Sequence, residues 1–348
     1  MKRIFEIDKN FKVETFTDHD DAVFYDPRNA PFRIYGIFYE NGMFRRLPER
    51  VARATNEGVV YLHANTAGGR VRFRTDSPYI LINTKMSGVD HMNHFPLVGS
   101  AGFDLYVDNE YEASFMPPQG MRKGYESIAE FGTRALRDVT IHMPLYANVT
   151  EFGIGLSADA KLLPAAEYRE VPPIVYYGSS ITQGGCASRP GNAYQNILSR
   201  RLNVDHVNLG FSGSARGEDA ITEYIAGLEM SVFVLDYDHN APDVEHLKNT
   251  HEKMFRAIRA KHPELPVLMM SRPKFRLTED EKKRRAVVKA TFDNAVAAGD
   301  KNVYFLDGPA LMALAGNEGT VDNCHPNDLG FYSMAKAVEK VLEEIFKF

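Results

Sequence analysis

The chain of 348 residues contains no tryptophan and only two cysteines, Cys186 and Cys324. Two cysteines are too few for a disulfide framework or a four-cysteine zinc site, so we expect reduced thiols, with a single Cys186–Cys324 bond as the alternative. An excess of positive charge is also missing, because 41 Lys and Arg stand against 46 Asp and Glu, a net charge of −5. A weakly acidic chain without a basic tract is not expected to bind nucleic acid.

Long hydrophobic runs are absent as well. No apolar run approaches the roughly 20 residues of a membrane helix, so we expect no membrane span. The first residues, MKRIFEID, contain two acidic side chains that interrupt any apolar signal segment. The default expectation is a cytoplasmic protein, or a secreted or periplasmic one if a leader precedes the given sequence. The length predicts about two domains.

The first half of the chain has the pattern of an all-β domain. Short segments rich in aromatic and β-branched residues alternate with turn residues, among them Gly68-Gly69 and Asp108-Asn109, which we place in hairpin turns. Helical periodicity is almost missing here, so we predict an antiparallel β-sandwich over residues 1–168. The predicted strands are 32–39, 59–64, 70–75, 79–85, 103–107, 139–145 and 151–156.

The second half changes to an alternation of apolar strands and amphipathic helices after a proline-containing joint near residues 164–173. Buried apolar strands that alternate with helices are typical of a parallel α/β sheet, which we predict over residues 169–348. The predicted strands are 174–177, 206–209, 232–235, 267–270 and 303–306, and the predicted helices are 193–202, 218–228, 244–261, 279–298 and 329–346.

Small and polar residues follow three of these strands directly. The first strand ends in Gly178-Ser179-Ser180, where a glycine allows a tight turn and lifts a serine hydroxyl above the sheet edge, although a helix cap would use the same residues. The second ends in residues 210–213, where small side chains let a backbone amide approach a ligand. The third is followed by Asn240, whose side-chain amide is a donor. In parallel sheets such loops hold the ligand site.

The last strand is followed, after a short helix, by a loop that contains Asp322 and His325. Residues three apart in one turn can lie on the same side of a loop. The Asp322 carboxylate can then accept the Nδ1 proton of His325 and leave Nε2 free as a base. A single histidine is usually structural, but this pair follows three other polar loops in order. We therefore expect the four loops to converge on one site.

The four loops, in this order, resemble the motif blocks of the SGNH (GDSL-type) hydrolases over about residues 170–348. The resemblance places the nucleophile at Ser180 and completes a catalytic triad with Asp322 and His325. It places the oxyanion donors at the backbone amides of Ser180 and Gly213 and at the side chain of Asn240. It implies no metal ion and no organic cofactor.

The first half resembles the β-sandwich that precedes the hydrolase domain in one bacterial branch of this family. The branch signature G-x-D-L-Y here reads Gly102-Phe103-Asp104-Leu105-Tyr106. The resemblance implies a jelly-roll-like antiparallel sandwich over 1–168 and a flavodoxin-like three-layer α/β/α hydrolase domain over 169–348. Two motif positions depart from the family pattern: Ser179 replaces the aspartate before the nucleophile, and Ala241 replaces the aspartate after the oxyanion asparagine.

The resemblance implies a serine esterase that works through an acyl-enzyme. Its similarity to bacterial carbohydrate esterases favours removal of small acyl groups, acetyl first among them, from a sugar or polysaccharide. Two alternatives remain. One is an acyltransferase that uses the same acyl-enzyme, and the other is a carbohydrate-binding protein without turnover. The sequence does not indicate the oligomeric state.

Three further groups have more than one interpretation. Arg189 and Arg272 are candidate substrate contacts, with surface or inter-domain pairing as the alternative. The segment 90–94 contains an H-x-x-H pair but lacks the three or four converging ligands of a metal site. We therefore expect residues 91–95 to be either an ordinary loop or one that closes over the catalytic mouth. The acidic and then basic stretch from Glu279 fits the start of a helix.

Overall fold

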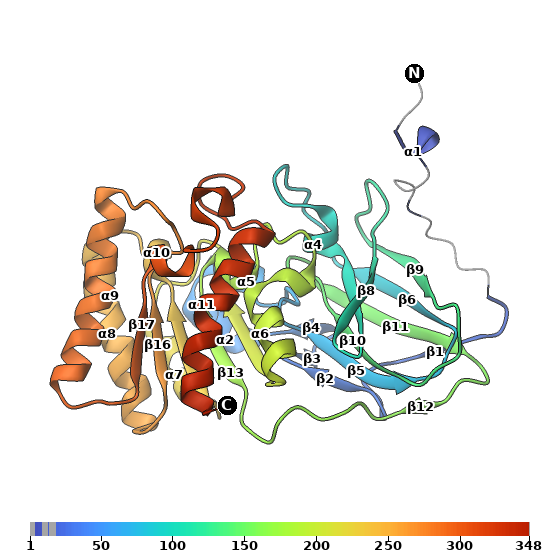
Figure 1. Ribbon diagram of the computed structural model, residues 1–348, viewed down its shortest axis with the longest axis horizontal. Helices are drawn as coiled ribbons and strands as arrows, with labels where there is room; N and C mark the ends of the chain where they lie inside the picture. Colours follow the sequence, from blue (N-terminus) through green and yellow to red (C-terminus); the bar gives the residue numbers. More distant parts are fainter. Residues whose placement is uncertain (1–3, 9–12, 14–18, 348) are drawn as a thin grey trace.

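The computed structural model describes residues 4–8, 13 and 19–347 (Figure 1). After the short helix α1 (Ile4–Ile7), antiparallel sheets extend to β12 (Leu162–Leu163), and a parallel sheet begins at β13 (Ile174–Gly178). Figure 1 shows the antiparallel part in blue and green on one side and the parallel sheet with its helices in yellow to red on the other. Among the described residues, none of the helices is both long and apolar enough to cross a membrane.

Two antiparallel sheets pack face to face in the first part. Apolar residues that alternate along both sheets are fully buried between them, including Phe73, Ile82, Phe103, Ile141 and Ile154. The first sheet has the order β1 (Ala22–Tyr25), β11 (Val149–Ser157), β6 (Tyr79–Met86), β9 (Gly124–Glu130). The second has the order β12, β5 (Arg70–Thr75), β10 (Arg137–His142), β7 (Phe103–Val107), β8 (Glu110–Phe115). In this sheet β2 (Arg33–Tyr35) also pairs with β5. A separate two-stranded sheet consists of β3 (Phe38–Glu40) and β4 (Met43–Arg45).

The parallel sheet has five strands in the order 2-1-3-4-5, which is the flavodoxin-like order. The strands read β14 (His206–Gly210), β13, β15 (Val232–Asp236), β16 (Val267–Met270) and β17 (Val303–Leu306). Because the order reverses between β13 and its neighbours β14 and β15, the loops after these three strands open a crevice at their carboxyl ends.

Helices cover both faces of this sheet, because alternate strand residues point to opposite sides. Val175 and Tyr177 pack into one core and Ile174 and Tyr176 into the other. The predicted three-layer α/β/α architecture is therefore confirmed. The first core contains α7 (Asp219–Ala226), α8 (Val244–Lys261) and α9 (Glu279–Ala297), and the second contains α6 (Tyr194–Leu202) and α11 (Asp328–Phe346). Short helices in the connections are α4 (Leu97–Ala101), α5 (Ser180–Gln183), η2 (Pro190–Asn192), η3 (Asp238–Asn240), α10 (Gly308–Leu311) and η4 (Gly316–Gly319).

The predicted strand at 59–64 is wrong, because this segment forms helix α3 (Glu57–Leu62), preceded by α2 (Glu49–Thr55). Asn56 caps α3 by accepting a hydrogen bond from the Val59 amide at 2.9 Å. The apolar side chains of α2 and α3 join the core that contains α7, α8 and α9. Packing against the C-terminal half therefore outweighs the β preference of the consecutive valines in this segment.

Other strand predictions differ in detail. The segment 32–39 is two short strands, and β1, β8 and β9 were not predicted. Asp108 and Asn109 form the β7–β8 hairpin turn with φ of 50° and 69°, as predicted. Gly68, in contrast, lies in no hairpin, since α3 and not a strand precedes it. A Cβ on Gly68 would stand 2.7 Å from the Asn208 Cβ, so glycine permits close approach to β14.

Arg46 joins the two halves of the chain from a position that is only 1% exposed. Its guanidinium donates to the carbonyls of Leu62 (2.9 Å) and Asn65 (2.6 Å) in the first half. It also donates to the carbonyls of Asn208 (3.1 Å) and Gly210 (2.6 Å) in β14. Burial lowers the Arg46 pKa to about 9. Arg46 thus holds the carboxyl end of β14 against the N-terminal half. Gly213 lies in the loop that follows this strand end.

We expect Arg46→Ala to lower the free energy of unfolding by at least about 3 kcal/mol, because each buried acceptor left without a donor costs about 1–3 kcal/mol. Urea denaturation followed by circular dichroism measures the change. The exposed neighbour Arg50 provides the matched control, and Arg50→Ala should stay within about 0.5 kcal/mol of wild type. Equal stability of the two variants would contradict the role given to Arg46.

Candidate active site

Ser180 is the first residue of α5, directly after β13, and it is 5% exposed. Ser179 caps this helix, since its hydroxyl accepts a hydrogen bond from the Ile181 amide at 3.1 Å. Serine and aspartate are comparable helix caps, so Ser179 supplies the cap that the family's aspartate could supply. A Cβ on Gly178 would stand 2.2 Å from the Asp236 carbonyl and from the Thr182 hydroxyl, so the turn before Ser180 needs glycine.

The structure brings Ser180, His325 and Asp322 into one hydrogen-bonded chain. The Ser180 Oγ lies 2.9 Å from the His325 Nε2, and the His325 Nδ1 lies 2.8 Å from the Asp322 Oδ2. The other carboxylate oxygen of Asp322 accepts the backbone amides of Cys324 (3.0 Å) and His325 (2.7 Å). The loop before α11 thus fixes the carboxylate and the ring relative to each other, while Ser180 comes from the end of β13.

The protonation of the site is set by close polar contacts. Burial raises the Asp322 pKa, but hydrogen bonds from the His325 side chain and amide outweigh it and lower the pKa to about 2. The hydrogen bond with the Cys324 thiol and then that with Asp322 raise the His325 pKa to about 9, against the effect of burial. Burial raises the Cys324 pKa, yet hydrogen bonds with His239 and His325 lower it to about 5.

The two further predicted donors, Gly213 and Asn240, lie after β14 and β15 on the same sheet edge. Gly213 has φ of +65°, a conformation that favours glycine. The Asn240 Nδ2 donates one hydrogen to the Phe211 carbonyl at 3.0 Å, which orients the amide and leaves its second hydrogen for a ligand. The neighbouring amide of Ser212 donates to the Gln183 Oε1 at 3.0 Å.

Gln183 and Arg284 support these donors, and sequence reasoning missed both. The fully buried Gln183 holds the Ser212 amide with its oxygen and donates its Nε2 to Asn65 at 2.9 Å, in the N-terminal half. Arg284 of α9 donates to the carbonyls of Asp238 and Ala241, both at 2.8 Å, on either side of Asn240. The predicted start of a helix at Glu279 is confirmed, and a capping box closes its first turn. Arg284, in the basic stretch of this helix, also contacts the loop that contains Asn240.

The N-terminal half also reaches the site. From the segment 90–94, the His94 Nε2 lies 3.6 Å from the Asp322 Oδ2, and the rings of His94 and His325 are 5.8 Å apart. The Tyr146 hydroxyl donates to the Ser180 carbonyl at 3.4 Å. This loop therefore lies beside the triad, and its closing over the catalytic mouth stays a prediction.

The G-x-D-L-Y signature forms a second joint between the halves. The Asp104 carboxylate is fully buried and accepts the Gly191 amide at 2.7 Å and the Arg189 guanidinium at 3.1 Å. A Cβ on Gly191 would stand 2.5 Å from the Tyr106 hydroxyl, so the ring of Tyr106 needs a glycine opposite it. Arg189 also lies over the Tyr111 ring at 3.9 Å.

Both candidate substrate-binding arginines have protein partners. Arg189 pairs with Asp104 as described, which agrees with the inter-domain alternative. Arg272 pairs with Glu281 at 2.7 Å, and its amide donates to Asp238 at 3.1 Å. A substrate contact by either arginine stays a prediction. The alternative of a Cys186–Cys324 bond is wrong, because both cysteines are free thiols.

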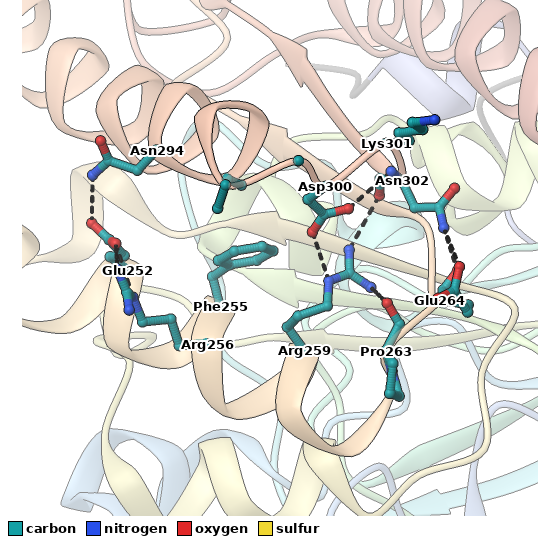
Figure 2. Close-up of a pocket in the computed structure, with 13 residues that line it drawn as sticks. Glu252, Phe255, Arg256, Arg259, Pro263, Glu264, Asn294, Asp300, Lys301 and Asn302 are labelled. Carbon is teal, nitrogen blue, oxygen red and sulfur yellow. Dashed lines mark hydrogen bonds and ion pairs between the residues drawn. The ribbon is translucent and has the colours of Figure 1, made fainter.

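A pocket near the carboxyl-terminal ends of α8 and α9 lies at the opposite edge of the sheet (Figure 2). Its lining includes residues that precede β16 and β17, at the amino ends of these strands. Figure 2 shows polar side chains of its lining that contact one another: Arg259 binds Asp300 at 2.8 Å, and Glu252 accepts from the Asn294 amide at 2.9 Å. We therefore place the active site at the edge that carries Ser180.

Comparison with solved structures shows a shared fold. A putative GDSL-like lipase from Bacteroides ovatus is 27% identical with a TM-score of 0.83, and the match covers 94% of this chain and 98% of that one. A salicylyl-acyltransferase from a tetracycline biosynthetic pathway is 20% identical with a TM-score of 0.77, over the same shares of the two chains. An acetyl xylan esterase from Butyrivibrio proteoclasticus is 12% identical with a TM-score of 0.62, over 94% and 99%.

A search of curated proteins finds no matching sequence. Two family matches cover most of the chain between them. Residues 171–343 match the GDSL-like lipase/acylhydrolase family, and residues 22–162 match the N-terminus of SGNH hydrolase-type esterases. The chain is therefore an esterase-type hydrolase that belongs, through residues 171–343, to the GDSL-like lipase/acylhydrolase family and carries in residues 22–162 the N-terminal domain of SGNH hydrolase-type esterases.

Proposed function

We propose that the protein hydrolyses carboxylic esters through an acyl-enzyme, with Ser180 as nucleophile, His325 as general base and Asp322 as its partner. The observation that carries the proposal is the unbroken chain from the Ser180 Oγ through both ring nitrogens of His325 to the Asp322 carboxylate. His325 takes the proton of Ser180 as the oxygen attacks the ester carbonyl. It then returns this proton to the leaving alcohol, and Asp322 stabilises the imidazolium between the two steps.

The proposed oxyanion hole consists of the backbone amides of Ser180 and Gly213 and the second Nδ2 hydrogen of Asn240. Negative charge that develops on the carbonyl oxygen is stabilised by donors fixed in advance, and each donor is typically worth about 2.7–4 kcal/mol in the transition state. The hydrogen bond of the Ser212 amide to Gln183 holds the loop that contains Gly213, and the hydrogen bond to the Phe211 carbonyl orients the Asn240 amide. These contacts fix the donors before the substrate binds. Water then attacks the acyl-enzyme with His325 again as base.

As substrate class we propose small acyl esters of carbohydrates, acetyl esters first. Support comes from side chains of the sandwich that border the triad, since the Tyr146 hydroxyl contacts the Ser180 carbonyl and His94 lies beside Asp322. The fold is shared with a family two carbohydrate esterase from Clostridium thermocellum solved with cellohexaose, which is 14% identical with a TM-score of 0.63. That match covers 91% of this chain and 99% of that chain.

Acetate release from acetylated mono- and polysaccharides, measured beside octanoyl and longer-chain esters, tests the proposal. We expect wild type to prefer acetyl sugars and Ser180→Ala to lose nearly all turnover. Ser179→Ala is the matched control, because it removes a helix cap worth about 0.5–2 kcal/mol of stability and leaves the nucleophile in place. Equal activity of wild type and Ser180→Ala would reject the mechanism, and a preference for long chains would reject only the substrate class.

Asn240→Ala should lower kcat by roughly 10²–10³-fold, because it removes one oxyanion donor. KM should change much less, since the donor acts mainly on charge that develops in the transition state. Steady-state kinetics with p-nitrophenyl acetate measure both constants. An unchanged kcat would remove Asn240 from the oxyanion hole.

The pH dependence of kcat/KM should be alkaline. His325 acts as a base only when its ring is neutral, and its pKa is raised to about 9, so kcat/KM should rise with pH until the pH passes that value. Cys324→Ser removes the largest cause of this shift, so the midpoint should move to lower pH and the rate at pH 7 should increase. Profiles of wild type and Cys324→Ser that coincide would contradict this assignment.

Acyl transfer to an alcohol is the second candidate, because it starts from the same acyl-enzyme. Its support is the fold shared with the salicylyl-acyltransferase. Adding methanol or a free sugar during p-nitrophenyl acetate turnover separates the two candidates. Acetate is the main product if water attacks the acyl-enzyme, and the acetylated alcohol is the main product if transfer dominates.

A further inference from the structure

Three metal-ligating side chains from three separate segments meet beside Ser180. They are the imidazoles of His94 and His325 and the thiol of Cys186, and their ligand atoms all lie within 4.8 Å of one another. His94 comes from the sandwich, Cys186 from the loop after α5, and His325 from the loop before α11. Because these segments are far apart in the chain, spacing in the sequence gives no sign of the group.

The ligand set suits Zn²⁺, which binds imidazole nitrogen and thiolate sulfur at about 2.0–2.3 Å in a tetrahedron. Ligand atoms in such a site stand roughly 3.3–3.8 Å apart, so these side chains need to close by about 1 Å. His94 is 44% exposed and has room to turn inward. The Asp322 Oδ2, which lies 3.6 Å from the His94 Nε2, is placed to supply the fourth ligand.

Cys186 is held in an unusual way. The residue is 5% exposed, and its backbone has φ of +73°, in the left-handed region that residues other than glycine rarely adopt. Such a conformation costs about 1–3 kcal/mol and is found most often at ligand-binding and catalytic sites. The strain agrees with a thiol that the loop holds in place for a ligand.

Metal binding and catalysis compete for the same ring. One nitrogen of His325 contacts the Ser180 Oγ and the other contacts Asp322, so a metal bond to either nitrogen must displace one of these contacts. We propose that Zn²⁺ binds His94, Cys186 and His325 and thereby inhibits the protein by withdrawing His325 from Ser180 or Asp322. The Cys186 thiol loses its proton to solvent when the bond to zinc forms. The inhibition rests on the proposed function, whereas the binding does not.

Equilibrium dialysis of the full chain against Zn²⁺ tests binding without any activity. We expect one zinc per chain for wild type, and a Co²⁺ complex with a thiolate charge-transfer absorption. Cys186→Ser and Cys186→Gly should both lose the absorption. Glycine also relieves the left-handed backbone, which offsets part of the packing lost with the buried Cys186 side chain. Wild type that binds no zinc, or Cys186 variants that keep the absorption, would overturn the site.

Zinc titration of p-nitrophenyl acetate hydrolysis tests inhibition, with EDTA to reverse it. Loss of a group that only supports a metal ligand weakens metal binding by roughly 10–100-fold. Cys186→Ser and His94→Gln each remove a proposed ligand itself. Each variant should therefore raise the half-inhibitory zinc concentration by at least about 10–100-fold. His91→Gln is the matched control for His94, because the His91 Nε2 contacts the Met121 carbonyl and is not in the group.

The thiol of Cys324 provides the second control. Asp322, Cys324 and His325 form another group with ligand atoms within 4.8 Å, but two of its three members are consecutive in the chain. Cys324→Ser should still be inhibited by zinc, with a half-inhibitory zinc concentration no higher than that of wild type, measured against its own zinc-free rate. If Cys324→Ser lost zinc inhibition while Cys186→Ser kept it, zinc would bind the group that contains Cys324, and the proposal would be overturned. If the zinc-free protein hydrolyses no ester, the proposed function fails, and dialysis still decides the zinc site.

Discussion

The hydrogen bond between the Ser180 Oγ and the His325 Nε2 is the contact on which the rest of the site depends. It is 2.9 Å long and joins residues that are 145 positions apart in the chain. Such a contact exists only if the carboxyl end of β13 and the loop before α11 are fixed within a fraction of an ångström. The parallel sheet with its two helical layers provides that rigidity, and Asp322 orients the ring from within its own loop.

The N-terminal half is part of this arrangement and not only a neighbour of it. Arg46 and the pair of helices α2 and α3 bind it to β14 and to the core of the hydrolase half. Asp104 of the G-x-D-L-Y signature binds it to the loop between α5 and α6. Because His94 and Tyr146 lie beside the triad, the same joints that stabilise the protein also position one wall of the site.

The parallel sheet and the four polar loops could be predicted because strands and helices of that half have clear periods, and small or polar residues follow the strands that carry the site. The helix α3 could not, because its valines favour a strand until the hydrolase core packs against them. Gln183 and Arg284 also escaped prediction, and the inter-domain alternative for Arg189 did not identify its partner Asp104. Each acts through a contact between distant segments, which the local pattern of residues does not contain.

Trapping of the nucleophile tests the central claim most directly. A phosphonate ester that mimics the tetrahedral intermediate should label one residue, and mass spectrometry of the digested protein should locate the label on Ser180. Labelling should fall sharply in His325→Ala, since the base no longer activates the hydroxyl. A label on Ser179 or elsewhere, or an equal labelling rate in His325→Ala, would contradict the account.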